Sequence, residues 1–182
     1  MLISCQKSRQ LGFTLIELLV AVTIVAILTS IAFPSFQTWL INSQIRNAAE
    51  SVSNGLQRAR AEAVSHNTNI AFTLTTPPNS SWSVSYVVTP VSAVTVIDSR
   101  SSNEGSKAVT VTALAADLVT PATTVTFNSF GSVVTTGAPP LARVDFSAPG
   151  GTRNLRVVIL SPGSNVRMCD PNAPSASTIG CP

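Results

Sequence analysis

The feature that most constrains this chain is an apolar run near its start, from Phe13 to Phe36. It follows a short polar, basic leader that ends at Gly12. About two dozen apolar residues are enough to cross a bilayer as a helix, at roughly 1.5 Å per residue. The run carries one carboxylate, Glu17, near its beginning. Because a carboxylate in hydrocarbon costs about 2.5 to 3.5 kcal/mol or more, Glu17 is predicted to be a functional group that needs a partner.

The order of the N-terminal segments differs from that of an ordinary secretory signal. In such a signal, a small-residue cleavage site follows the apolar stretch. Here the small residue, Gly12, precedes Phe13 and the whole run. Cleavage after Gly12 would remove the leader and keep the hydrophobic helix in the mature protein. The basic leader also predicts that the C-terminal end of the helix lies outside the cytoplasm. A plain signal anchor with a stray glutamate is the alternative.

The composition favours an exported, β-rich domain after the helix. The chain has 182 residues, enough for one modest domain beyond the apolar run. Only 10% of the residues are charged, and aromatic residues are few, which suits β-structure outside the membrane better than a cytosolic enzyme. The formal net charge of +3 falls to about +1 without Lys7 and Arg9 of the leader, so the overall charge does not indicate a nucleic-acid partner.

The cysteines support the same topology. Cys5 lies in the leader, which leaves Cys169 and Cys181 near the C-terminus of the mature chain. Two cysteines in an oxidising compartment most simply form one disulfide, and closing a loop of this size stabilises a protein by about 3 kcal/mol. A metal site is not expected, because His66 is the single histidine and no C-x-x-C spacing occurs.

After Pro34 the helical pattern continues, now as an amphipathic helix. With the apolar run it predicts one rod of roughly 50 residues, on the order of 80 Å long, with a kink or local unwinding near Pro34. The helix is expected to end between residues 65 and 69. The charged residues Arg46, Glu50, Arg58, Arg60 and Glu62 lie off the apolar stripe, whose members recur in steps of three and four: Ile41, Ile45, Ala48, Val52, Leu56, Ala59 and Ala63.

From Asn69 the apolar period changes to two, which predicts strands. A chain of one long helix followed by short, closely spaced strands is expected to be α+β, with an antiparallel sheet on the C-terminal half of the helix. Arg100–Lys107 and Ala138–Leu141 are expected to be exposed loops. The predicted strands begin with the alternating residues Ile70, Phe72, Leu74 and Trp82, Val84, Tyr86, Val88, and continue with Val94–Asp98, Val109–Thr112, Thr123–Asn128, Ser132–Thr135, Arg143–Ser147, Leu155–Leu160 and Val166–Cys169.

The segment G-F-T-L-I-E-L-L-V, which begins at Gly12, resembles the processing site of type IV prepilins and type II secretion pseudopilins. The resemblance implies that a prepilin peptidase cuts after Gly12 and methylates the new amino group of Phe13. It also implies that Glu17 occupies the position at which this class of proteins carries an acidic residue. In a filament, that carboxylate would neutralise the methylated amine of a neighbouring subunit.

Three later segments resemble the GspH/FimT family of minor pilins and pseudopilins. They are the helical A-A-E-S-V-S-N-G-L-Q-R-A-R-A-E-A-V-S-H-N, the turn T-F-N-S-F-G-S-V and the terminal L-R-V-V-I-L-S-P-G-S-N-V-R-M-C-D-P. Some FimT proteins bind DNA through a Gly-Arg-x-Arg motif just before the cysteine. The matching stretch here, Ser164 to Arg167, keeps only the second arginine. DNA is therefore not the favoured partner, and the candidate phosphate contacts are Arg143, Arg153, Arg156 and Arg167, with Lys107.

The sequence shows no catalytic constellation and implies no cofactor. His66 is expected near the helix exit, in a capping or solvent-exposed role. Serine, histidine and acidic residues do not fall into a triad order, and no glycine-rich phosphate loop occurs. The aromatic residues are expected in the core or at the membrane interface: Trp39, Trp82, Tyr86 and Phe127.

These observations predict four segments: a leader (1–12), a membrane helix (13–36), an amphipathic helix (37–67) and a β-rich periplasmic head (68–182). The expected function is that of a minor pilin, a structural and assembly subunit of a type IV pilus. Its expected partners are other pilins, a prepilin peptidase and, before assembly, lipid of the bacterial inner membrane. The alternatives are a minor pseudopilin of type II secretion and a DNA-binding minor pilin of natural transformation.

Overall fold

The structure is a computed structural model that describes residues 12–87, 95–160, 163–174 and 176–181. It divides into two compact units, with the boundary between Gln37 and Thr38. One helix, α1 (Leu15–Ser65), contributes to both units. Pro34 lies inside this helix, and the residues on either side of it are helical, so the expected local unwinding is not seen.

The N-terminal unit is the apolar part of α1. Its side chains are exposed, and it contains a window apolar and long enough to cross a membrane, with a mean hydropathy of 2.5. Three hydroxyl groups of this segment bond to the helix's own carbonyls, those of Thr23, Thr29 and Ser30: Thr23 Oγ1 donates to Val20 O at 2.8 Å and Ser30 Oγ to Ile27 O at 2.8 Å. Such bonds satisfy polar groups that would find no water in lipid.

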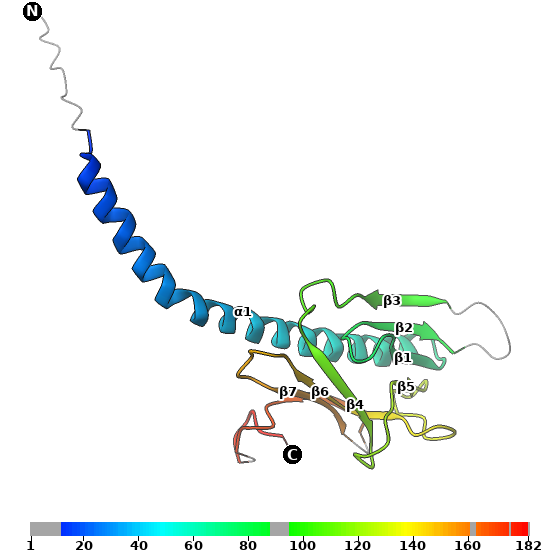
Figure 1. The fold of residues 1–182 in the computed structure, drawn as a ribbon. Helices are drawn as coiled ribbons and strands as arrows, with labels where there is room; N and C mark the ends of the chain where they lie inside the picture. The colour runs from blue at the N-terminus through cyan, green and yellow to red at the C-terminus, as the bar shows by residue number, and fades with distance from the viewer. Residues whose placement is uncertain (1–11, 88–94, 161–162, 175, 182) are drawn as a thin grey trace, which may run out of the picture. The chain divides into compact units, whose positions relative to one another are not determined.

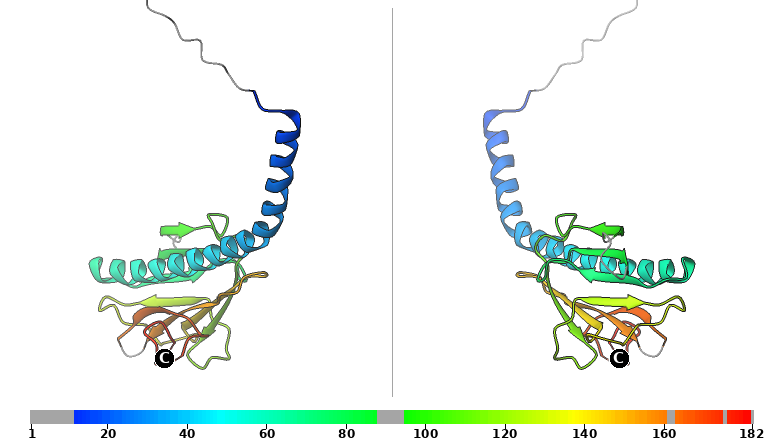
Figure 2. Two further views of the ribbon diagram at one scale, coloured as in Figure 1. Left: turned by 90° about the vertical axis from the view of Figure 1, so that its left-hand side faces the viewer. Right: turned by 90° about the vertical axis from the view of Figure 1, so that its right-hand side faces the viewer.

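In the head, the predicted apolar stripe of α1 faces the core. Ile45, Val52, Leu56 and Ala59 are each no more than 1% exposed, whereas Arg46 is exposed. The helix ends at Ser65, within the predicted range. Figures 1 and 2 show strands of two sheets alongside this half of the helix. Its buried residues and those of both sheets form one hydrophobic cluster.

The first sheet has the order β3-β2-β1-β5, and all its pairs are antiparallel. The predicted alternation holds in β1, where every second side chain is buried in the core. Val88 and Val94, expected at strand ends, lie outside the described residues. The bounds are β1 (Ile70–Leu74), β2 (Trp82–Tyr86), β3 (Val96–Arg100) and β5 (Thr124–Phe127).

The second sheet has the order β4-β6-β7-β8 and is also antiparallel. The expectation of one sheet is therefore corrected to two, both within an α+β fold. The side-chain period places residues on a face, but it does not determine which strands pair. The bounds are β4 (Thr110–Ala115), β6 (Leu141–Ser147), β7 (Leu155–Leu160) and β8 (Asn165–Cys169).

Three local expectations are wrong. Ser132–Thr135 is not a strand; it makes an isolated bridge between Val133 and Phe127. Leu141, expected in an exposed loop, is the buried first residue of β6 because its side chain enters the core. Arg100, also expected in a loop, ends β3 opposite Trp82.

Candidate functional site

The predicted processing site lies where α1 begins. Gly12, Phe13 and Thr14 precede the helix, and the side chain of Phe13 is 82% exposed. The hydroxyl of Thr14 accepts a hydrogen bond from the backbone N–H of Glu17 at 3.3 Å, so Thr14 caps the helix. A T-x-x-E sequence at this position is a capping-box pattern. Only the threonine half of the box is formed, and the exposed Glu17 carboxylate has no partner within the described part of the chain.

Three of the four candidate arginines share one face of the second sheet. Arg143 in β6 lies opposite Val158 in β7, which in turn lies opposite Arg167 in β8. Arg156 in β7 lies opposite Asp145, two residues from Arg143, so its side chain is on the same face. The intervening residues point into the core on the other face.

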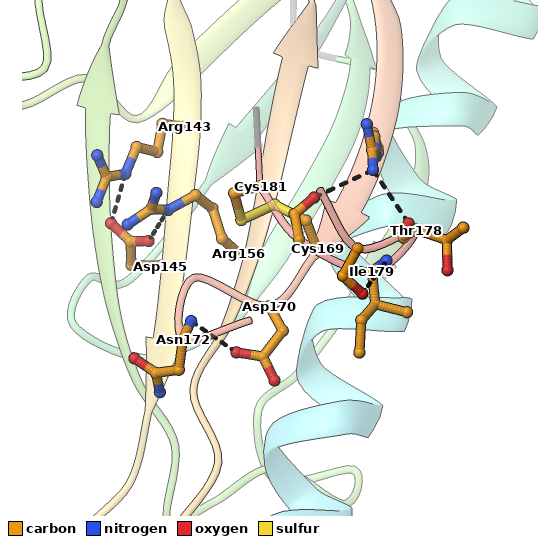
Figure 3. The surroundings of a disulfide bond; sticks show 12 residues. Arg143, Asp145, Arg156, Cys169, Asp170, Asn172, Thr178, Ile179 and Cys181 are labelled. Atoms are coloured by element: carbon orange, nitrogen blue, oxygen red, sulfur yellow. Dashed lines mark hydrogen bonds and ion pairs between the residues drawn. A yellow bond between two sulfur atoms is a disulfide. The ribbon is translucent and has the colours of Figure 1, made fainter. Parts of the chain in front are cut away.

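Two of these arginines share one carboxylate. Arg143 Nε donates to Asp145 Oδ2 at 2.7 Å and Arg156 Nε to Asp145 Oδ1 at 2.6 Å (Figure 3). All three side chains are 20–27% exposed. Asp145 therefore cancels part of the positive charge of the face. Sequence reasoning missed it, although the spacing R-V-D in a strand already places Arg143 and Asp145 side by side on one face.

Arg167, the arginine retained from the family's DNA-binding motif, holds the C-terminal segment. Its Nη2 donates to the backbone oxygens of Thr178 and Gly180, each at 3.1 Å. Beside it, Cys169 and Cys181 form the predicted disulfide, with their Cα atoms 5.0 Å apart (Figure 3). The guanidinium of Arg167 is thus partly occupied by backbone carbonyl groups of the C-terminal segment.

Arg153 does not belong to this face. It lies in the loop between β6 and β7, where its backbone N–H donates to Asn42 Oδ1 of α1 at 3.1 Å. Arg153 lines a polar cleft of about 570 Å³, together with Trp39, Arg46 and Asp170. Lys107 is exposed in the loop that leads to β4. Sequence reasoning did not bring the members of this cleft together, because they come from three distant parts of the chain.

The remaining residues of interest have structural contacts. His66, exposed just beyond α1, lies 3.1 Å from Glu62 (Nε2 to Oε2) and makes an edge contact with Tyr86. Trp82 is buried and donates its indole N–H to Ser51 Oγ at 2.8 Å. Phe127 is fully buried, whereas Trp39 is 63% exposed. Among the residues described, no group of three His, Cys, Asp or Glu side chains is placed to hold a metal ion.

Comparison with known proteins gives matches of two kinds. Residues 7–33 match the prokaryotic N-terminal methylation motif, and residues 48–163 match the family described as type II transport protein GspH. The type IV major fimbrial protein FimA of Dichelobacter nodosus is 51% identical over 39 residues, 21% of this chain and 25% of that protein. A fimbrial protein of Pseudomonas aeruginosa is 42% identical over 55 residues, 30% of this chain and 35% of that protein. The chain thus spans about a quarter to a third of the length of these relatives.

Two solved structures share the fold. The type IV minor pilin FimU of Pseudomonas aeruginosa is 21% identical and aligns over 73% of this chain and 90% of FimU, with a TM-score of 0.50. The minor pseudopilin EpsH of the type 2 secretion system of Vibrio cholerae is 12% identical and aligns over 71% of this chain and 99% of EpsH, also with a TM-score of 0.50. Because the GspH match covers well over half of the residues, and a methylation motif precedes it, this chain belongs to the GspH family of type IV pilin-like proteins.

Proposed function

We propose that this chain is a minor pilin, a structural and assembly subunit of a type IV pilus. It is processed after Gly12, methylated at Phe13 and held in the bacterial inner membrane by residues 13–36, with its head in the periplasm. Its partners are then a prepilin peptidase, lipid of the inner membrane and, after extraction from the membrane, other major and minor pilins. The methylation motif at residues 7–33 supports the processing step.

The observation that carries this proposal is the unpaired carboxylate of Glu17 in the first turn of an apolar helix. A buried charge is stable only with a partner of opposite sign, and losing one member of such a pair costs about 3 to 5 kcal/mol. Cleavage after Gly12 would create a positively charged amine on Phe13. In a filament, that amine on one subunit would neutralise Glu17 of its neighbour, so that both charges could enter the apolar interior.

The test is incorporation of Glu17→Gln, which removes the charge but keeps the side chain's size. Filaments sheared from cells should contain much less of this variant than of wild type. Glu104→Gln, at an exposed head residue paired with Arg100, is the matched control and should be incorporated normally. Thermal unfolding of both full-length variants should match wild type. Normal incorporation of Glu17→Gln would remove the charge-pairing mechanism.

A second candidate is a minor pseudopilin of a type II secretion system. It is favoured by the family's description as a type II transport protein and by the fold shared with EpsH. Deletion of the gene in its native host separates the two. Loss of surface pili with normal export supports the pilus, whereas loss of protein export with normal pili supports the secretion system.

A further inference from the structure

A polar cleft of about 570 Å³ opens on the head where α1 meets two loops. Its helical wall carries Trp39 and Arg46, and its other wall carries Arg153 from the β6–β7 loop and Asp170 from the segment after β8. Asn42 joins the walls: its Oδ1 accepts the backbone N–H groups of Thr152 and Arg153 at 3.0 and 3.1 Å. The loop is therefore fixed against the helix, and the cleft is preformed.

Arg46 and Arg153, which both line this cleft, have guanidinium donors that no described residue uses. Arg46 uses its Nε to bind Glu50 Oε1 at 2.8 Å, which leaves four further N–H groups. This ion pair is about half exposed and therefore weak. The guanidinium of Arg153 makes no hydrogen bond or ion pair with the described residues. Two such groups are suited to bind the oxygens of one phosphate.

The cleft also carries a fixed negative charge. Asp170 follows the disulfide residue Cys169, and its backbone N–H donates to Ile179 O at 2.7 Å. Its Oδ1 accepts the N–H of Asn172 at 2.8 Å, which orients the carboxylate (Figure 3). A ligand suited to the whole cleft therefore carries an anionic group, such as a phosphate, and a positive group close to it.

The position of the cleft in the sequence indicates where such a ligand would come from. Trp39 follows the end of the apolar run, Phe36, by only three residues, and Arg46 follows it by ten. Tryptophan is enriched where a membrane helix enters the head-group layer, and arginine side chains reach back toward that layer from beyond it. A chain anchored by residues 13–36 thus keeps the cleft tethered close to lipid head groups.

We propose that this cleft binds the head group of a zwitterionic phospholipid, with phosphatidylethanolamine as the chemistry that fits it. Arg46 and Arg153 bind the phosphate, Asp170 binds the ammonium group and Trp39 packs beside the glycerol region. The proposal rests on membrane anchoring of the precursor. It adds a second contact between the protein and the bilayer, which must break when the subunit is extracted into a filament.

The experiment uses the full-length mature protein in dodecyl maltoside micelles, titrated with dihexanoylphosphatidylethanolamine and followed by tryptophan fluorescence. Wild type should show a saturable change that is absent in Trp39→Phe. The double variant Arg46→Gln/Arg153→Gln should bind at least about ten-fold more weakly, as expected for the loss of charge-assisted bonds to phosphate. The matched control is Arg58→Gln/Arg100→Gln, which also removes one helical i,i+4 ion pair and one arginine outside the helix, at the end of β3. It should bind as wild type does.

Further arms identify the source of the phosphate and the role of the carboxylate. Asp170→Asn should lose the preference for ethanolamine over glycerol head groups, measured with dihexanoylphosphatidylglycerol. Inorganic phosphate at the same concentration should not compete; competition would mean a free-anion site and overturn the proposal.

Equal weakening of lipid binding in both double variants, or no saturable change in fluorescence, would also overturn it. So would unaltered lipid binding with lost filament incorporation in Arg46→Gln/Arg153→Gln, because the occupant would then be a protein. All variants should unfold at the same temperature as the control.

Discussion

Gly55 of α1 packs against Phe72 of β1 so closely that a Cβ atom at residue 55 would lie 2.9 Å from Cε2 of the phenylalanine ring. It would also lie 3.0 Å from two ring carbons of Trp82. Both rings are buried, and Trp82 is further held by its hydrogen bond to Ser51. A glycine that is otherwise unfavourable in mid-helix is thus required by the helix–sheet packing.

We expect Gly55→Ala to destabilise the head. Overpacking of a core costs about 1–3 kcal/mol, and the better helix propensity of alanine returns about 1 kcal/mol, so the net loss should be about 1 kcal/mol. Asn54→Ala, at the exposed neighbouring position, measures the propensity gain alone and should be neutral or stabilising. Chemical denaturation of the full-length proteins in detergent measures both. A more stable Gly55→Ala variant would contradict the close packing.

Replacement of Gly12 by valine should leave the precursor uncut, because the peptidase needs a small residue before the cleaved bond. Membranes should then contain a chain that still carries the leader, including Cys5. N-terminal mass analysis distinguishes the two forms. A wild-type mature chain that begins anywhere other than Phe13 would show that the processing site is assigned wrongly.

The C-terminal segment should loosen in steps, because the disulfide and Arg167 hold it independently. Reduction should raise hydrogen exchange within residues 170–181 while the rest of the second sheet stays protected, and Arg167→Gln should raise it further. The loss of stability on reduction should be about 3 kcal/mol at most.

Protein from the periplasm should show no free thiol by alkylation and mass analysis. Two alkylated thiols in the native protein would refute the disulfide there.

Duplex DNA should bind weakly at most, because Asp145 cancels part of the charge of the arginine face and Arg167 is bonded to backbone carbonyls. Electrostatic binding should fall with salt by a slope of about 0.9 per phosphate neutralised. Titration of the full-length protein at two salt concentrations measures this slope. Asp145→Asn should strengthen the binding and steepen the slope. Tight, salt-sensitive binding by wild type that Arg167→Ala abolishes would instead favour a role in DNA uptake.

The free energy of unfolding should depend on pH in the acid range because of Asp117. The side-chain hydrogen bond from Thr120, followed by the backbone N–H groups of Thr120 and Val119, lowers the pKa of Asp117 below its usual value. A lowered folded-state pKa contributes stability above the unfolded pKa of about 3.9 that is lost as the pH falls through the folded-state value. The stability difference between wild type and Asp117→Asn should therefore be present at neutral pH and vanish in strong acid. Thr120→Val should reduce this difference; an unchanged pH profile in both variants would contradict the assignment.

The sequence by itself determined the local elements of this protein. The apolar run that begins at Phe13 marks the first half of α1, a stripe that includes Ile45 and Leu56 marks its buried face, and the period of two in Ile70–Leu74 marks β1. These are short-range patterns whose physical cause lies within a few residues. The pairing of Cys169 with Cys181 was also predicted from the sequence, because the predicted cleavage of the leader would remove Cys5.

Only the tertiary structure decided which distant residues meet. Alternation places Arg143 and Arg156 on a face of their strands, but the pairing of β6 with β7 is what brings both to Asp145. The cleft with Arg46 and Arg153 likewise exists because Asn42 fixes a loop more than a hundred residues away. Strand pairing and loop docking depend on burying one shared core, which is a property of the whole chain, and no short window of sequence contains it.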